Sequence, residues 1–303
     1  MDTPFEKYFR MGIVHFMAFP ELGAGEGPWE ETLRHIALDP FFSVVEVTRI
    51  VDPKTRERVK KLIEEAGLSV AYAAHPAILG QGLDVNSLDE DHRVSTCDIL
   101  KQHLDEAITM GAENFVLLSG RDPGDEKRPD AVQALVKSLG ELCAYSTQKG
   151  GPTIVIESFD REVDKCCLLG PATLAREVAE AVRSEHDNFG LMVDLGHIPL
   201  LKETPMQALA PVKDYLSHIH LGNAVLDKGC AGYGDNHPIF GMPGSANGLP
   251  EMIDFLKTLL DIGFLDGHSF PIVSFEIKPL EGQDSLSIIA NAKRMMNRAW
   301  AMV

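Results

Sequence analysis

Eight short apolar runs, separated by segments with helical patterns, constrain the fold of this chain more than any other feature. The runs are rich in Val, Ile, Leu and Phe and lack strict polar–apolar alternation. Strands that are buried on both faces have this composition. We therefore expect strands near residues 11–18, 43–49, 68–75, 113–119, 153–158, 190–195, 216–221 and 271–276.

The segments between the runs carry helix signatures. We expect helices at Lys54 to Ala66, Cys97 to Met110, Asp130 to Gln148, Pro171 to Ser184 and Leu249 to Leu260. Gly67, Gly111 and Gly150 stand where the C-caps of three of these helices would be. Eight strands that alternate with helices predict an α/β fold of the (β/α)₈ TIM barrel type. We expect residues 1–303 to form it as a single domain.

A doubly wound sheet is the rival architecture. It usually carries a glycine-rich fingerprint between its first strand and the following helix. The segment Gly23-Ala24-Gly25-Glu26-Gly27-Pro28 follows the first apolar run, but it lacks the spacing of the third glycine and includes an acid. We therefore interpret it as a flexible rim of an active site rather than as a nucleotide-binding loop.

Charge and cysteine content narrow the classes of partner. The net charge of −17 argues against a nucleic-acid backbone or an anionic membrane as partner, because both need a basic surface. The five cysteines include the adjacent pair Cys166 and Cys167 but no C-x-x-C pair. Their number and spacing argue against a zinc finger or a disulfide scaffold and favour a cytoplasmic location. The first residues do not resemble a signal peptide. The sequence contains no run of about 18 apolar residues, so we expect no membrane span.

Four of the runs in the second half of the chain end in side chains that can bind a metal: Glu157, Asp194, His220 and Glu276. Burying a lone carboxylate costs several kcal/mol unless a cation or hydrogen bonds compensate. In a barrel, the C-terminal ends of consecutive strands open on one mouth, so one divalent cation could serve all four.

Three carboxylates and one imidazole form a mostly oxygen ligand set. It suits Mn²⁺ best, with Mg²⁺, Co²⁺ and Zn²⁺ as alternatives. The competing interpretation is that each acid pairs with an Arg or Lys in the barrel core. Arg161 and Lys278 are the cations that follow Glu157 and Glu276 most closely.

Further polar side chains fall near the same mouth. His197 follows Asp194 in an Asp-x-x-His pattern and could bind a substrate hydroxyl, ligate a metal or simply pack. Glu46 could orient His75, contact substrate, or form an ion pair with Arg49. The side chains that we expect to contact the substrate are Glu46, His75, Arg161, His197 and His237.

Three histidines receive separate expectations. We place His218 on the face of its strand opposite to His220, in a packing role. His15 lies within the first predicted strand and could face the barrel interior. His237 belongs to the segment from Asn223 to Gly248, which is too long for an ordinary loop and could reach over the mouth.

This residue set permits proton transfer next to a carbonyl. A metal that holds two vicinal oxygens of a sugar acidifies the neighbouring C–H, and a flanking carboxylate or histidine can then move the proton. Glu157 and Glu276 would approach from opposite sides of the mouth, as epimerisation requires. Isomerisation, or β-elimination of a leaving group, would use the same enediolate.

The set Glu157, Asp194-x-x-His197, His220 and Glu276 resembles that of the xylose isomerase-like barrel superfamily, in particular its sugar epimerase branch. The resemblance covers almost the whole chain. It implies that Glu157, Asp194, His220 and Glu276 are the metal ligands, that Glu157 and Glu276 are also the acid/base pair, and that His197 contacts the substrate. The superfamily also contains DNA-repair endonucleases with several zinc ions, but the charge of −17 argues against that branch.

The sequence departs from the free-ketose epimerases in two places. Leu226 stands where those enzymes typically have an Arg, and the segments His218–Asn223 and Gly234–Pro238 differ from theirs. Together with Glu157–Arg161, these segments are more similar to the barrel subunits of bacterial C-glycoside deglycosidases. That resemblance implies metal-assisted β-elimination from a 3-oxo-glycoside and a small β-sandwich partner subunit. His197, His237 or His75 could then replace a glutamate as the base.

The leading hypothesis is thus a metal-dependent sugar isomerase or epimerase, with the lyase as the alternative. A barrel that binds a sugar or a partner without turnover is the third hypothesis, and the intact Glu157 and Glu276 argue against it. We expect either a homo-oligomer or a hetero-oligomer with a small second subunit.

Overall fold

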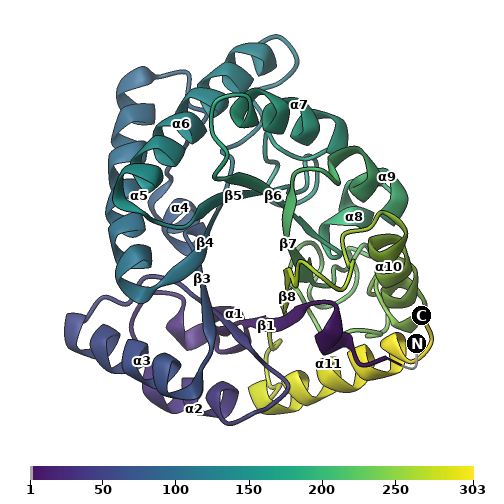
Figure 1. Cartoon of the computed structure of the whole chain (residues 1–303). Coiled ribbons are helices and arrows are strands. Elements are labelled where there is room, and N and C mark those ends of the chain that lie inside the picture. The colour runs from purple at the N-terminus through teal and green to yellow at the C-terminus, as the bar shows by residue number, and fades with distance from the viewer. Residues whose placement is uncertain (1–2) are drawn as a thin grey trace.

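The chain forms a closed barrel of eight parallel strands ringed by helices (Figure 1). The structure is a computed structural model that describes residues 3–303. The strands pair in sequence order, and β1 closes the barrel against β8. They are β1 (Arg10–Val14), β2 (Val44–Val47), β3 (Ser69–Ala73), β4 (Ala112–Leu118), β5 (Thr153–Glu157), β6 (Phe189–Asp194), β7 (Leu216–Leu221) and β8 (Ile272–Phe275). The predicted (β/α)₈ barrel is confirmed.

Helices follow the strands and cover the outside of the barrel. They are α1 (His15–Ala18), α2 (Trp29–Ala37), α3 (Pro53–Ala66), α4 (His75–Gln81), α5 (Glu90–Met110), α6 (Arg128–Lys149), α7 (Ala172–Arg183), α8 (His197–Leu200), α9 (Pro205–Leu209), α10 (Leu249–Asp261) and α11 (Ser285–Trp300). Short 3₁₀ turns span Phe5–Lys7, Pro20–Leu22 and Ala210–Val212. Among residues 3–303, no helix has the length and apolar character that a membrane span needs.

The five predicted helices are confirmed, with one clear difference in their ends. Helix α5 begins at Glu90 rather than Cys97, because the Asp89 side chain caps it by accepting the amides of Asp91 and His92. Gly67, Gly111 and Gly150 adopt the left-handed conformation just past α3, α5 and α6, as predicted.

The first strand is shorter than predicted, and this changes the position of His15. Strand β1 ends at Val14, and His15 begins α1. Its Nε2 lies 3.0 Å from Thr32 Oγ1 on α2, and its ring packs edge-on against Phe19 and Trp29. The expectation that His15 faces the barrel interior is therefore wrong, because the chain turns outward one residue before it.

Alternation along each strand separates two layers of side chains. Residues such as Phe115, Ile154 and Leu191 belong to the large apolar core, which packs mainly against the helices. Their neighbours Val116, Val155 and Met192 form a small separate cluster, which we place inside the barrel. We call the side chains that point into the barrel the inward set of a strand. Once one inward residue is identified, every second residue along that strand belongs to the same set.

Candidate metal and active site

The four strand-end side chains lie on the inward set of their strands. Glu157 follows Val155 by two residues on β5, and Asp194 follows Met192 by two on β6. His220 likewise follows His218 by two residues on β7. Glu276, just beyond β8, follows Ser274 by two residues. Because side chains alternate along a strand, all four point into the mouth at the C-terminal end of the barrel.

The four groups converge closely enough to share one cation. Each offers one ligand atom, and these atoms all lie within 4.8 Å of one another. The Nδ1 atom of His220 is 2.8 Å from Glu276 Oε2 and 3.9 Å from Glu157 Oε1. Glu157, Asp194 and His220 are buried, and the side chain of Glu276 is 12% exposed. The structure therefore brings the four predicted ligands together.

Two buried oxygen atoms without a hydrogen bond support a cation at this position. Glu157 Oε1 and Asp194 Oδ2 accept no hydrogen bond. Their nearest charged neighbours are His197 Nδ1 at 3.3 Å and His237 Nδ1 at 3.7 Å. The other oxygen of Asp194, Oδ1, accepts the backbone amides of Gly196 and Gly222. A buried carboxylate oxygen without a partner is costly, so a divalent cation fits the charge and the donor set of this site.

The ionisation of this cluster reflects burial and mutual attraction. Burial raises the pKa of Asp194 to about 7, against the influence of the nearby histidines. For His220, burial opposes the charge, but Glu46 and Glu276 outweigh it and raise the pKa of the imidazole well above its ordinary value. Without a metal, protonated histidines thus supply the positive charge that the carboxylates need. Metal binding would displace those protons.

A second group of side chains borders the first, and it includes a residue that the sequence analysis missed. The Nε2 atom of His197 lies 3.1 Å from Asp235 Oδ1, and the Nε2 atom of His237 lies 2.9 Å from the same oxygen. Lys165 Nζ is 3.3 Å from Asp235 Oδ2. Asp235 is buried. Burial alone would raise the pKa of its carboxyl, but His237 and His197 outweigh it and lower that pKa well below its usual range. The position of Asp235 two residues before His237 was the available signal.

His197 is oriented by the backbone. Its Nδ1–H donates to Ser158 O at 2.9 Å, so Nε2 is the nitrogen that faces Asp235. His197, Asp194 and His237 also form a group that could hold a cation. The long segment from Asn223 to Gly248 therefore reaches over the mouth through His237, at the place the sequence analysis expected.

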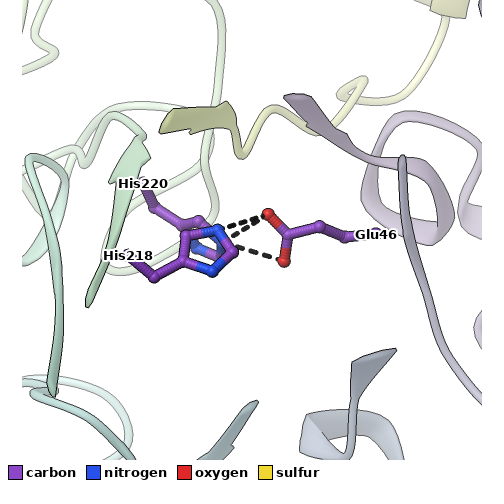
Figure 2. Close-up of side chains that lie close together, drawn as sticks. All are labelled: Glu46, His218 and His220. Atoms are coloured by element: carbon purple, nitrogen blue, oxygen red, sulfur yellow. Dashed lines mark hydrogen bonds and ion pairs between the residues drawn. The ribbon is translucent and has the colours of Figure 1, made fainter. Parts of the chain in front are cut away.

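One hypothesis was that Glu46 orients His75, but in the structure the two side chains have different partners. The Nε2 atom of His75 lies 3.0 Å from Glu157 Oε2. Glu46 crosses the barrel interior from β2 and contacts His218 and His220 on β7 (Figure 2). Placing His218 opposite to His220 was an error of parity, because residues two apart on a strand share a face. His218 lies inside the barrel and is fully buried.

Arg161 lies away from the four converging side chains. Its Nη2 donates to Leu168 O at 2.7 Å, and its Nε is 3.5 Å from Asp122. The ion-pair partners of Glu157, Asp194 and Glu276 are instead histidines. Lys278 reaches the mouth, where its amide donates to His237 O at 2.7 Å. The structure thus favours a shared cation over pairing with Arg or Lys.

A cavity of about 260 Å³ opens above the cluster. His75, His237 and Glu276 contribute polar groups to it, and Lys165, Asp235 and Lys278 add charge. Apolar side chains form another part of its wall: Phe16, Met17, Leu79 and Phe159. Gly23 lines it, so the glycine-rich segment contributes to the rim at one end. A larger hollow of about 440 Å³ lies beside Arg10 and Glu113, at the end of the barrel where active sites are not found.

Solved structures with the same architecture include several epimerases. A D-tagatose 3-epimerase-like protein matches with a TM-score of 0.71 and 17% identity over 97% of this chain and 99% of its own. An L-ribulose 3-epimerase gives 0.69 and 18% over 97% and 96%. A 3-keto-D-glucoside 4-epimerase from E. coli gives 0.66 and 16% over 95% and 99%. At such identities these likenesses show the fold.

The family follows from the sequence itself. A comparison with curated proteins gives no match. Residues 42–289, most of the barrel, match the xylose isomerase-like TIM barrel family. The chain therefore belongs to the xylose isomerase-like TIM barrel family.

Proposed function

We propose that this protein is a divalent-metal-dependent enzyme that moves a proton next to the carbonyl of a sugar or keto-sugar. The observation that carries the proposal is the convergence of Glu157, Asp194, His220 and Glu276, with buried oxygens of the first two left without hydrogen bonds. The family match and the sugar epimerases among the structural neighbours agree with this class of chemistry.

Mn²⁺ is the proposed cofactor, because the ligand set is mostly carboxylate with one imidazole. A bound divalent cation would hold two vicinal oxygens of the sugar and make the C–H next to the carbonyl more acidic. The cavity above the cluster offers the space that such a substrate needs.

Glu157 and Glu276 are the proposed acid/base pair. They come from the β5 and β8 ends of the mouth, so one can take a proton from one face of a carbon and the other can return a proton to the opposite face. Removal of the proton leaves its electron pair in an enediolate, which the returning proton quenches with inverted configuration. His75 lies 3.0 Å from Glu157, and His237 lies 3.8 Å from Glu276. Each carboxylate therefore has a histidine close enough to stabilise its negative charge.

A second candidate is a lyase that acts on 3-oxo-glycosides by β-elimination. The apolar wall of the cavity, formed by Phe16, Met17, Leu79 and Phe159, suits an aglycone better than a small free sugar. One structural neighbour is named for a 3-keto-glucoside substrate. A small partner subunit would accompany this activity, whereas an epimerase needs none beyond copies of itself.

The chemistry is tested by incubating the Mn²⁺-loaded protein in D₂O with free ketoses and with 3-oxo-glycosides. We expect deuterium at the carbon next to the carbonyl for one class, and release of the aglycone if the lyase candidate holds. Glu276→Gln should reduce turnover by about 100-fold or more, as is typical for loss of a general acid or base. Glu281→Gln, an exposed control just beyond β8, should leave turnover unchanged. The absence of both deuterium exchange and aglycone release with every substrate of either class would contradict the proposed mechanism.

Metal binding is tested separately by thermal unfolding. Mn²⁺ at 100 times its dissociation constant should stabilise the folded chain by about 2.7 kcal/mol, and EDTA should remove that gain. The Asp194→Asn variant should show a much smaller response to Mn²⁺. A wild-type protein whose unfolding temperature is the same in Mn²⁺ and in EDTA would refute the metal site.

A further inference from the structure

A buried carboxylate outside the proposed ligand set forms a bridge behind His220. Glu46 lies on β2, fully buried, and its carboxylate contacts two imidazoles of β7 across the barrel interior (Figure 2). His218 Nε2 is 2.8 Å from Glu46 Oε1, and His220 Nε2 is 3.1 Å from both oxygens. Burying a carboxylate is costly unless it is paired and hydrogen-bonded, and the two imidazoles supply that pairing here.

Small residues leave room for this bridge. Strands β1 and β8 lie between β2 and β7 in the closed sheet. Gly12 on β1 and Ser274 on β8 pair in register and point inward, and a Cβ at Gly12 would lie 2.3 Å from Ser274 Oγ. A larger side chain at Gly12 would therefore collide with Ser274, and the space that these two small residues leave lets Glu46 extend past them to β7.

The hydrogen bonds fix how His218 is protonated. Its Nδ1 lies 3.2 Å from the amide nitrogen of Asn114, which can only donate. Nδ1 therefore accepts, and Nε2 carries the proton that it donates to Glu46. Both ring nitrogens of His218 are used, so His218 holds Glu46 in place and has no lone pair left for a cation.

The same logic sets the orientation of His220. Its Nε2–H donates to the Glu46 carboxylate, which leaves Nδ1 directed at Glu276 Oε2, 2.8 Å away, in the proposed ligand cluster. His218 packs edge-on against the His220 ring, with centroids 5.1 Å apart, and limits its rotation. A carboxylate that accepts from the far nitrogen of a ligating histidine fixes its tautomer and makes it a better ligand.

We propose that Glu46 is a positioning residue for the metal site, and that Asn114, His218 and Glu46 form a buried relay that presents Nδ1 of His220 to the cation. This inference rests on the proposed function, because it assigns a task to Glu46 only if His220 binds a metal. It replaces the expectation that Glu46 contacts substrate.

The direct test measures Mn²⁺ affinity by competition with a chelating dye and follows the bound ion by electron paramagnetic resonance. Glu46→Gln should weaken Mn²⁺ binding by roughly 10- to 100-fold, the usual effect of removing such a partner, and alter the spectrum of the bound ion. Glu57→Gln, an exposed carboxylate on α3, is the matched control and should leave both unchanged. Equal affinity and an identical spectrum in Glu46→Gln overturn the proposal.

A second variant separates positioning from simple support of the fold. His218→Gln removes the imidazole that holds Glu46 and its packing against the His220 ring, but leaves the Glu46 carboxylate, so it should weaken Mn²⁺ binding less than Glu46→Gln. The double variant should lose little more than Glu46→Gln alone, because both act through one path. If Glu46→Gln does not fold, His218→Gln alone decides the matter. Lower thermal stability of the metal-free variants with unchanged Mn²⁺ affinity means a structural role and contradicts positioning.

The outcome is distinct from a failure of the proposed function. If the wild-type protein binds no Mn²⁺, the metal site itself is refuted. If the wild type binds one ion per chain and the Glu46 and His218 variants bind it equally well, only the relay is refuted. A second ion per chain that is lost in His218→Gln would mean that Glu46, His218 and His220 hold a cation of their own. Because the tautomer assigned to His218 excludes such a cation, this result would overturn the relay.

Discussion

At the scale of single residues, the proposed metal site leaves no room for a side chain at Gly222. It follows β7, and its amide donates to Asp194 Oδ1 at 2.9 Å. A Cβ at Gly222 would lie 2.6 Å from both carboxylate oxygens of Asp194 and 2.6 Å from His237 Nδ1. The absence of a side chain here lets two groups of the site pack against the backbone.

Gly222→Ala should therefore displace Asp194 and His237. We expect Mn²⁺ binding to weaken by at least tenfold, turnover to fall by about 100-fold, and the free energy of unfolding to fall by about 1–3 kcal/mol. Gly80→Ala is the control, because a Cβ there meets open space near the end of α4. It should leave metal binding unchanged. Wild-type affinity in Gly222→Ala would show that the site adapts easily, contrary to this account.

At the scale of elements, the loop between β5 and α7 is organised by one buried carboxylate. Asp160 accepts the amides of Val163, Asp164 and Lys165 at 2.7 to 2.8 Å. These bonds curl the loop so that Lys165 reaches Asp235 and lines the cavity. Hydrogen bonds to a charged group contribute more than neutral ones, so the loop conformation depends strongly on this residue.

Asp160→Ala should open this loop while the barrel stays folded. We expect hydrogen exchange at the amides of residues 163–165 to accelerate by roughly tenfold or more, and substrate affinity to fall because Lys165 is released. Glu162→Ala, in the same loop, removes only an exposed ion pair with Lys202 and should change exchange little. Unchanged protection of the three amides in Asp160→Ala would contradict the role of this carboxylate.

At the scale of the whole molecule, His15 should make stability depend on pH. Burial against Phe19 and Trp29 lowers the pKa of its imidazole to about 3, so it stays neutral when folded. The unfolded chain takes up a proton at the ordinary pKa of about 6.5, so stability falls as pH drops from about 6.5 towards 3. At pH 5 the loss due to His15 is roughly 2 kcal/mol.

The test compares urea unfolding at pH 7 and pH 5. In His15→Gln the difference in unfolding free energy between the two values should be smaller than in the wild type by about 2 kcal/mol, because the titrating group is gone. The exposed His92 provides the control, and His92→Gln should keep the wild-type dependence. Identical pH dependence in wild type and His15→Gln would rule out this assignment.

Much of the fold was readable from the sequence, since the strands bury both faces and so appear as apolar runs. The eight runs and the glycines at the ends of α3, α5 and α6 have this direct physical basis. The ends of β1 and α5 were not readable, because a turn at His15 and a cap at Asp89 depend on local contacts. Short helices such as α4 and α8 were missed for the same reason.

The sequence by itself determined the barrel and the four converging groups Glu157, Asp194, His220 and Glu276, because alternation and strand order are properties of the chain. Only the tertiary structure decided which side chains meet across the barrel. Glu46 reaches His218 and His220 from 172 and 174 positions away, and Asp235 joins His197 from a loop. Arg161 turns to Asp122 instead of the mouth. Such pairings depend on closure of the sheet and on how each loop folds back, and no local pattern along the chain encodes those distances.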